Sequence, residues 1–386
     1  MTAFRQVLRR HLLLVACLIG HLHPGFATAL LGQTQTVTEL KVVASVDPAG
    51  QLLGEIEWIT RGPSGLVAVS DRGSGQVHFF FPDGRKAGAF GRRGEGPGEF
   101  TNMASSGWLG DTLWVADRNR FGVTYIDSKR RTLLRMEKWP ARLIGQLPEG
   151  VGRASTWSGM PRAIQKDGSL LVAVAERTSM QGDGQVIARQ YVLRIGVNGE
   201  VSSTLGVTPA RNCSPRSGLL TLDNLLCGAA YPVFAPAAGL FATIEDLPSQ
   251  NADFRRTAVH LRDHLGRSVY SSTLTEQSVE MSQQVRDSLV GWFSTRGPQG
   301  AKAASFLRNR KLPLVQRVVV GSDSVIWVLT NTRAGQRWVV LDSRGRIVRT
   351  VRPPKGLTIW SVWREGAWGV LEDASGGEAV VRVGWD

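Results

Sequence analysis

Acidic and amide side chains at the ends of apolar runs are the residues of this sequence best suited to metal chemistry. Hard cations such as Ca²⁺ prefer oxygen ligands, which such side chains supply. Acids in the same positions also commonly cap the backbone of tight turns. Both interpretations stay open, with turn caps the commoner outcome and a calcium site the weaker one. The candidate ligands are Glu57, Asp71, Asp117 and Asn119, with Glu176 and Asp323 in similar positions.

Histidine chemistry is limited by the small number of histidines. Beyond residue 29 they are His78, His260 and His264, and all three fall in predicted strands or in the turn beside one. His260 and His264 are four residues apart, but a strand followed by a turn does not bring such a pair to one face, so a zinc site is not expected. No Gly-x-Ser-x-Gly elbow occurs in a helical context, as a serine hydrolase would need. We expect structural histidines and assign no catalytic residue.

Arginine is abundant, and it could bind carboxylates or phosphates. The chain has 46 lysine and arginine residues against 32 acidic ones, which gives a formal net charge of +14. A guanidinium group recognises carboxylate or phosphate in a bidentate manner, although a single loop arginine is more commonly only solvated. The ligand-binding candidates on predicted loops are Arg72, Arg92, Arg93, Arg118, Asn119 and Arg120.

The elements that must position these side chains repeat along the chain. Each unit is an apolar strand, a short polar link, a second apolar strand, and a turn with Asp or Asn and usually Gly. The first unit runs from Leu66 through the Asp83-Gly84 turn, and the second ends at the Asp127 turn. These two turns are 44 residues apart, close to the period of one propeller blade. Three further units end at turns around Asn198, Asp263 and Asp342.

The sixth unit has only three strands before the chain ends. They lie at 360–363, 367–371 and 379–383, and the missing strand is available at 38–43. A ring in which one blade takes strands from both termini leaves no bare edge at the seam. The sequence therefore predicts an all-β, six-bladed β-propeller over residues 30–386, closed by pairing of the N-terminal strand with the last blade.

A glycine-rich connection carries the family resemblance. Residues 90–100 read FGRRGEGPGEF, and residues 114–120 read WVADRNR, followed by a short strand and an Asp turn. This pattern resembles the NHL-type six-bladed β-propellers, most closely the exported bacterial propellers of the TolB-like group. The match is good over 58–140, moderate over 312–386 and weak over 141–310. The resemblance implies the fold, and such propellers include binding platforms, lactonases, lyases and scaffolds. For the enzymatic alternative it implies a calcium-dependent hydrolase or lyase, such as a lactonase, with a site in the central channel.

One stretch departs from the strand pattern. Apolar residues at Met281, Val285, Leu289 and Trp292 have helical spacing, and Thr273 with Glu276 fits a capping box. We expect a helical insertion over about 273–310, with a second helix at 301–310. It would cover one face of the ring or act as a lid or partner-binding arm.

The N-terminus has the features of an export signal. A basic start with Arg5, Arg9 and Arg10 precedes an apolar segment from Leu12 to Gly20, and cleavage is expected after Ala29. The alternative is a lipoprotein signal with Cys17 as the lipidated residue. An uncleaved membrane anchor is disfavoured because the apolar run is shorter than the roughly 20 residues that span a bilayer. We expect a periplasmic or secreted protein.

Export also decides the expected cysteine chemistry and partners. In an oxidising compartment the two remaining cysteines, Cys213 and Cys227, are a plausible disulfide. The positive charge could favour a protein or anionic glycan partner, or it could simply maintain solubility. Because aromatic–basic motifs are lacking, no nucleic-acid partner is expected. We expect a monomer that needs no cofactor and binds a ligand or partner on one face without catalysis, with the calcium-dependent enzyme as the alternative.

Overall fold

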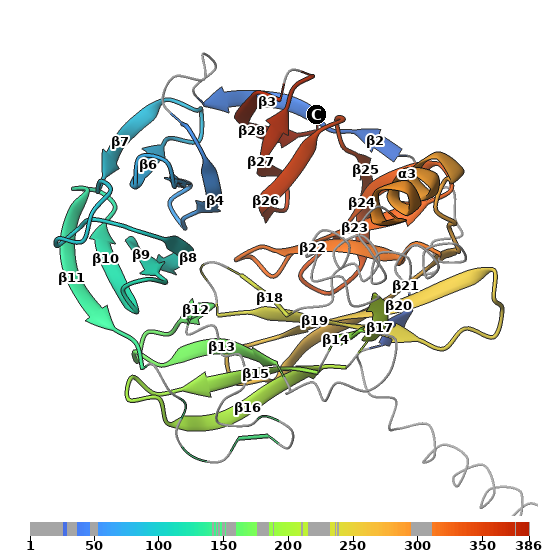
Figure 1. Cartoon of the computed structure of the whole chain (residues 1–386), viewed down its shortest axis with the longest axis horizontal. Coiled ribbons are helices and arrows are strands. Elements are labelled where there is room, and N and C mark those ends of the chain that lie inside the picture. The colour runs from blue at the N-terminus through green and yellow to red at the C-terminus, as the bar shows by residue number, and fades with distance from the viewer. Residues whose placement is uncertain are drawn as a thin grey trace, which may run out of the picture.

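The computed structural model describes residues 26–28, 37–46, 53–140, 160–175, 185–187, 189–209, 211–214, 232–235, 239–294, 311–374 and 376–385, and a few single residues between them. Six antiparallel sheets stand around a common axis (Figure 1), so the predicted six-bladed propeller is confirmed. Each blade has four antiparallel strands. Strands from the N-terminal region add a fifth strand to two of these sheets and supply the fourth strand of the last blade. Short strands joined by Asp and Gly turns favour such meanders, because each hairpin forms from residues close in sequence.

The strands of the first three blades are as follows. Blade 1 contains β4 (Ile56–Arg61), β5 (Val67–Asp71), β6 (Gln76–Phe80) and β7 (Lys86–Phe90). Blade 2 contains β8 (Met103–Leu109), β9 (Thr112–Asp117), β10 (Gly122–Asp127) and β11 (Thr132–Lys138). Blade 3 contains β12 (Ala163–Ile164), β13 (Leu170–Ala175), β15 (Gln190–Ile195) and β16 (Val201–Thr208). A separate two-stranded sheet pairs β14 (Gln185–Ile187) with β17 (Arg211–Ser214).

The remaining blades follow the same order. Blade 4 contains β18 (Val233–Phe234), β19 (Phe241–Leu247), β20 (Phe254–Arg262) and β21 (Ser268–Gln277). Blade 5 contains β22 (Val315–Val320), β23 (Ile326–Thr332), β24 (Gly335–Leu341) and β25 (Ile347–Arg352). Blade 6 contains β26 (Leu357–Trp363), β27 (Gly366–Glu372), β28 (Glu378–Gly384) and β3 (Lys41–Val46). The first strands of neighbouring blades contact one another, which places β4, β8, β12, β18, β22 and β26 nearest the axis.

Apolar side chains fill the spaces between blades. Between blades 5 and 6, buried Trp327 stacks on Trp385 with ring centroids 5.4 Å apart. Between blades 1 and 2, the buried Trp108 indole donates a hydrogen bond to Thr60 Oγ1 at 3.1 Å. Each blade therefore buries both of its faces against its neighbours, as the apolar inner strands require.

The predicted turn chemistry is confirmed where the turns are described. Asp342 Oδ1 accepts hydrogen bonds from the backbone amides of Arg344 and Arg346, both at 2.9 Å. Asp83 caps its turn through the amide of Arg85 at 3.0 Å, and Gly84 there has φ +89°. The carboxylates hold the turn backbone, and glycine adopts the left-handed conformation without strain.

Closure of the ring is also confirmed, with one correction. β3 pairs antiparallel with β28, and Val42 lies opposite Val383 and Val46 opposite Val380. The expected single strand at 38–43 is wrong, because β2 (Val37–Glu39) pairs in parallel with β25 of blade 5 instead. Leu40 lies between the two segments, is 5% exposed, and donates its amide to the Arg352 carbonyl at 3.0 Å. The segment therefore ties blade 5 to blade 6 as well as completing the last sheet.

The helical insertion begins later than expected. Residues 273–277 belong to β21, which pairs with β20 over its whole length, so the capping box of Thr273 and Glu276 is wrong. Leu274 is fully buried in the sheet, and the Glu276 carboxylate pairs with Arg337 of blade 5. Burial and this ion pair favour the strand over the local helical signal. The helix is α3 (Gln283–Ser294), and the expected second helix at 301–310 lies outside the described residues.

Several expectations fall on residues that the structure does not describe. Cys17, Glu176 and Cys227 are among them, so lipidation and the Cys213–Cys227 disulfide stay predictions. Of the expected leader, residues 1–29, only β1 (Phe26–Thr28) is described, and it pairs in parallel with β21. In the described part of the chain, no helix has the length and apolar character needed to cross a bilayer.

Candidate ligand-binding site

The strand order divides the loops between two faces of the ring. Consecutive strands in each blade run in opposite directions, so the β-turns between second and third strands and the connections between blades share one face. The β21–β22 connection, which contains α3, belongs to this face. We call this face of the ring the insertion face. All six ligand-binding candidates lie on it: Arg72 between β5 and β6, Arg92 and Arg93 between β7 and β8, and Arg118, Asn119 and Arg120 between β9 and β10.

Two of these arginines hold the glycine-rich connection together. Arg120 Nη1 donates hydrogen bonds to the carbonyls of Gly96 and Glu99, both at 2.9 Å. Arg92 Nε donates to Glu99 Oε1 at 2.6 Å, and Glu99 Oε2 accepts the Gly96 amide at 2.7 Å. The Gly96 amide and then Arg92 lower the pKa of the Glu99 carboxyl. Arg92 and Arg120 are therefore engaged in fixing the loop.

The other arginine candidates on this face make different contacts. Arg72 pairs with Glu55 and lies 3.6 Å from Glu57. Arg118 is exposed and donates its Nε–H to Met160 Sδ at 3.3 Å. The backbone of Arg93 packs against Gly75, where an added Cβ would lie 2.5 Å from the Arg93 nitrogen. Loop packing thus fixes the position of each of these arginines.

The candidate metal ligands Asp71 and Asp117 are occupied as turn caps. Asp117 accepts hydrogen bonds from the amides of Thr101 and Asn102 at 2.6 and 3.1 Å, and from the Asn119 amide at 3.0 Å. Asp71 accepts amides of Glu55 and Gly73 at 3.0 Å each and the Ser74 hydroxyl at 2.6 Å. Burial raises the pKa of Asp71, but the bonds from Ser74 and the amides lower it more.

The remaining metal candidates do not join them in one cluster. Asp323 lies on the opposite face, in the β22–β23 turn, where it accepts the amides of Val325 and Arg364 at 3.4 and 3.1 Å. The Asn119 side chain accepts a bond from Asn102 at 3.3 Å. Among the described residues, no three His, Cys, Asp or Glu side chains are grouped so that they could hold a metal ion.

Glu57 is different, because it lines a cavity at the ring axis. This cavity has a volume of about 430 Å³ and is formed by the inner strands of all the blades or the residues just before them. The polar and aromatic lining residues of this cavity are Glu57, Trp58, Thr60, Ser105, Ser106, Arg162, Phe234, Arg317 and Trp360.

Two arginines dominate the charge of this axial cavity. Arg162 precedes β12, and Arg317 lies in β22 with its guanidinium carbon 5.2 Å from the centroid of the Trp360 ring. Arg162 is exposed to solvent, but partial desolvation by the protein around it, followed by the positive charge of Arg118, lowers its pKa. Burial alone lowers the pKa of Arg317.

Neither arginine of the axial cavity is neutralised by a described carboxylate. No ion pair to Arg162 or Arg317 is found in the part of the chain that the structure describes. Glu57 is the one acid among the lining residues, and its nearest cation is Arg72 at the rim. Two positive charges that line one cavity without a carboxylate partner favour a bound negative charge, so this cavity is suited to an anion.

Sequence reasoning missed Arg162, Arg317 and Trp360. A signal was present for Arg317, since it lies with Gln316 inside the otherwise apolar segment from Leu314 to Val320. A charged residue in an inner strand of a propeller has only the channel or a blade interface to face. Arg162 and Trp360 carry no such mark in the sequence.

The histidines show one arrangement that the sequence did not predict. His78 is buried against Phe80. His260 of β20 has its Nδ1 2.8 Å from Ser271 Oγ on β21, and its Nε2 lies 3.5 Å from Glu245 on β19. Burial lowers the pKa of His260, against the effect of Glu245. A serine nucleophile would need free backbone amides nearby to stabilise an oxyanion. Ser271 lies within a strand that pairs with β20 and β1, so the backbone amides near it are used in the sheet.

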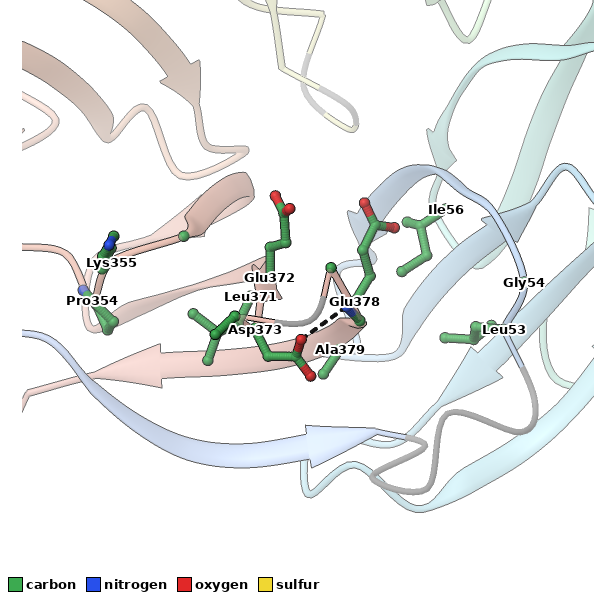
Figure 2. A pocket seen from close by; sticks show the side chains of 14 residues that line it. Leu53, Gly54, Ile56, Pro354, Lys355, Leu371, Glu372, Asp373, Glu378 and Ala379 are labelled. Carbon is green, nitrogen blue, oxygen red and sulfur yellow. Dashed lines mark hydrogen bonds between the residues drawn. The ribbon is translucent and has the colours of Figure 1, made fainter. Parts of the chain in front are cut away.

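A larger, open cavity of about 1070 Å³ lies on the insertion face between blades 6 and 1 (Figure 2). Glu372 and Glu378 face each other across the β27–β28 hairpin, and both carboxylates point to the same side of it. Asp373 points away from them and accepts the Gly377 amide at 2.9 Å. These acids are exposed, so solvent and salt screen their charge, in contrast to the arginines of the axial cavity.

Comparison with known proteins gives the fold only. No protein-family model matches the sequence, and no curated protein matches it. The structure is similar to that of an exported protein from Bacteroides fragilis, with 11% identity and a TM-score of 0.46 over 94% of this chain and 99% of that one. It is also similar to a calcium-binding protein, regucalcin, from Agrobacterium tumefaciens (11% identity, TM-score 0.37, 91% and 97% covered). Virginiamycin B lyase from Staphylococcus aureus is similar too (10% identity, TM-score 0.37, 89% and 98% covered). These values carry no argument about what this chain binds.

Proposed function

We propose that this protein is a non-catalytic binding propeller that holds a small organic anion in the axial cavity. The observation that carries the proposal is that two arginines, Arg162 and Arg317, line this cavity without a carboxylate partner among the described residues. A bound anion would replace the favourable interactions with water that the two arginines lose where protein surrounds them. Trp58, Phe234 and Trp360 give the cavity aromatic walls for the organic part of the ligand.

The proposal places the protein outside the cytoplasm. Its support is the basic and apolar leader of residues 1–29, with Cys17 lipidation as the alternative form of export. The NHL-type and TolB-like resemblance of residues 58–140 agrees with such a role. In that compartment we further propose a monomer with a Cys213–Cys227 disulfide.

The same cavity supports binding better than metal-dependent hydrolysis. Calcium takes six to eight oxygen ligands. Of the candidate metal ligands, Glu57 is the one that lines the cavity, whereas Asp71 and Asp117 are used as turn caps. We therefore propose binding that needs no metal ion and continues in the presence of a chelator.

A ligand screen on the mature protein, residues 30–386, tests the proposal. The thermal midpoint is measured with a panel of organic anions, and hits are titrated by calorimetry with and without EDTA. Bound ligand raises the midpoint by mass action. Arg317→Gln should abolish the shift, because it removes one enclosed cation.

Arg333→Gln is the matched control. Arg333 is exposed in the β23–β24 turn on the same face, so this variant makes the same change in residue type and charge outside the axial cavity. It should bind as the unmodified protein does. Anion binding that Arg333→Gln and Arg317→Gln weaken equally would reveal nonspecific attraction to a basic protein, and absence of any stabilising anion would refute the proposal.

A further inference from the structure

Charged and uncharged residues alternate around the axial cavity. Glu57 comes from blade 1, Arg162 from blade 3 and Arg317 from blade 5. Between them stand the hydroxyls of blade 2, the Phe234 ring of blade 4 and the Trp360 ring of blade 6. Because the six blades surround one axis (Figure 1), the three charged residues come from three separate sides of it.

The two arginines act as separate positive sites. Arg162 precedes β12 of blade 3 and Arg317 lies in β22 of blade 5, so the two arginines come from blades that are not neighbours. The Phe234 ring of blade 4 lines the cavity between them in blade order. One carboxylate therefore does not suit both sites, whereas a ligand with two acids on a short spacer does.

The third direction has the opposite charge. Glu57 lines the cavity with a side chain that is 35% exposed, and its single nearby cation, Arg72, is 3.6 Å away at the rim. Arg72 is also paired with Glu55, so it is shared between two acids. Glu57 thus keeps the capacity to accept a hydrogen bond from a ligand ammonium group.

Resting on the proposed function, we propose that the ligand is a small amino dicarboxylate, bound at three points. One carboxylate pairs with Arg162, the other pairs with Arg317, and the ammonium group faces Glu57. A cavity of about 430 Å³ is large enough for such a molecule.

Titration calorimetry with three probes that differ by one group each tests this recognition. L-Glutamate has two carboxylates and an ammonium group, glutarate lacks the ammonium group, and butyrate also lacks one carboxylate. We expect affinity to fall about tenfold or more at each step, since each step removes one charged hydrogen-bonding partner.

Three variants assign each group of the probe to its partner. Arg162→Gln and Arg317→Gln should each weaken glutarate and L-glutamate binding by about tenfold or more. Glu57→Gln should remove the preference for L-glutamate over glutarate while glutarate still binds. Arg333→Gln should leave all three affinities unchanged, and a urea midpoint for each variant confirms that it is folded.

The outcomes separate this inference from the function on which it rests. Butyrate binding as tightly as glutarate, or a glutamate preference that survives Glu57→Gln, overturns the three-point ligand. The three-point ligand is also overturned if phosphate or an aromatic monoacid binds in an Arg317-dependent manner and dicarboxylates do not bind. That result leaves the anion-binding function in place. If no anion of the wider panel binds, both proposals fail.

Discussion

Docking of the N-terminal strand can be tested by two identical substitutions in β3. Val46 is fully buried among residues of blades 6 and 1, whereas Val43 in the same strand is 51% exposed. Val46→Ala removes two methyl groups, worth about 0.8 kcal/mol each in lost burial, and leaves a cavity that adds to this. We expect a loss of about 2–3 kcal/mol in the free energy of unfolding.

Val43→Ala makes the same chemical change in the same strand, and it should cost less than about 0.5 kcal/mol. Both variants are compared with the unmodified protein by equilibrium urea denaturation, with the slope of the transition checked for constancy. Equal effects of the two variants would refute the reasoning, because they would mean that β3 is not packed against blade 1 in solution. The backbones of β3 and blade 1 also approach each other closely, since a Cβ on Gly84 of blade 1 would lie 2.7 Å from the Ser45 carbonyl oxygen of β3.

Two further predictions concern the loops of the insertion face. Gly75→Ala should lower the thermal midpoint much more than Gly110→Ala. Both glycines have positive φ, of +69° and +59°, so both substitutions strain the backbone. Only at Gly75 would the added Cβ also clash, because it would lie 2.5 Å from the Arg93 backbone nitrogen. Asp71→Asn should cost more stability at pH 7 than at pH 3. The folded pKa of Asp71 lies below its ordinary value of 3.8, so its contribution is present above that value and is lost as the pH falls through the folded pKa. Denaturant titrations at the two pH values measure it, and an equal cost at both would contradict the prediction.

The architecture was predictable because its signals are local and repeated. Asp and Gly turns such as Asp83-Gly84 mark the hairpins, and the bare edge of an incomplete last blade requires a strand from elsewhere. The division of the N-terminal segment at Leu40 was not predictable, because it depends on the distance between the edges of blades 5 and 6. The helix start was misplaced because a local capping pattern at Thr273 competed with ten residues of pairing between β20 and β21.

The candidate site was harder to predict than the fold. Loop arginines are easy to find in the sequence, and the structure places these candidates in the loops of blades 1 and 2. Whether each is available depends on acceptors that only the folded loop provides, as the two carbonyls bound by Arg120 show. The axial residues come from strands about 155 residues apart in the chain, Arg162 and Arg317, and nothing in the sequence places them around one cavity.

Net charge is therefore a poor guide to where this protein would bind an anion. A charge of +14 is spread over a surface on which arginines pair with neighbouring acids, as Arg85 does with Asp83 and Arg346 with Asp342. Such exposed pairs contribute little and are screened over about 8–10 Å at ordinary ionic strength. Arg317 of the axial cavity is half-buried, and partial burial both weakens its solvation and strengthens its attraction for an anion. Binding in the axial cavity should consequently persist in salt that abolishes nonspecific attraction to the surface, and loss of both at the same salt concentration would locate the anion on the surface.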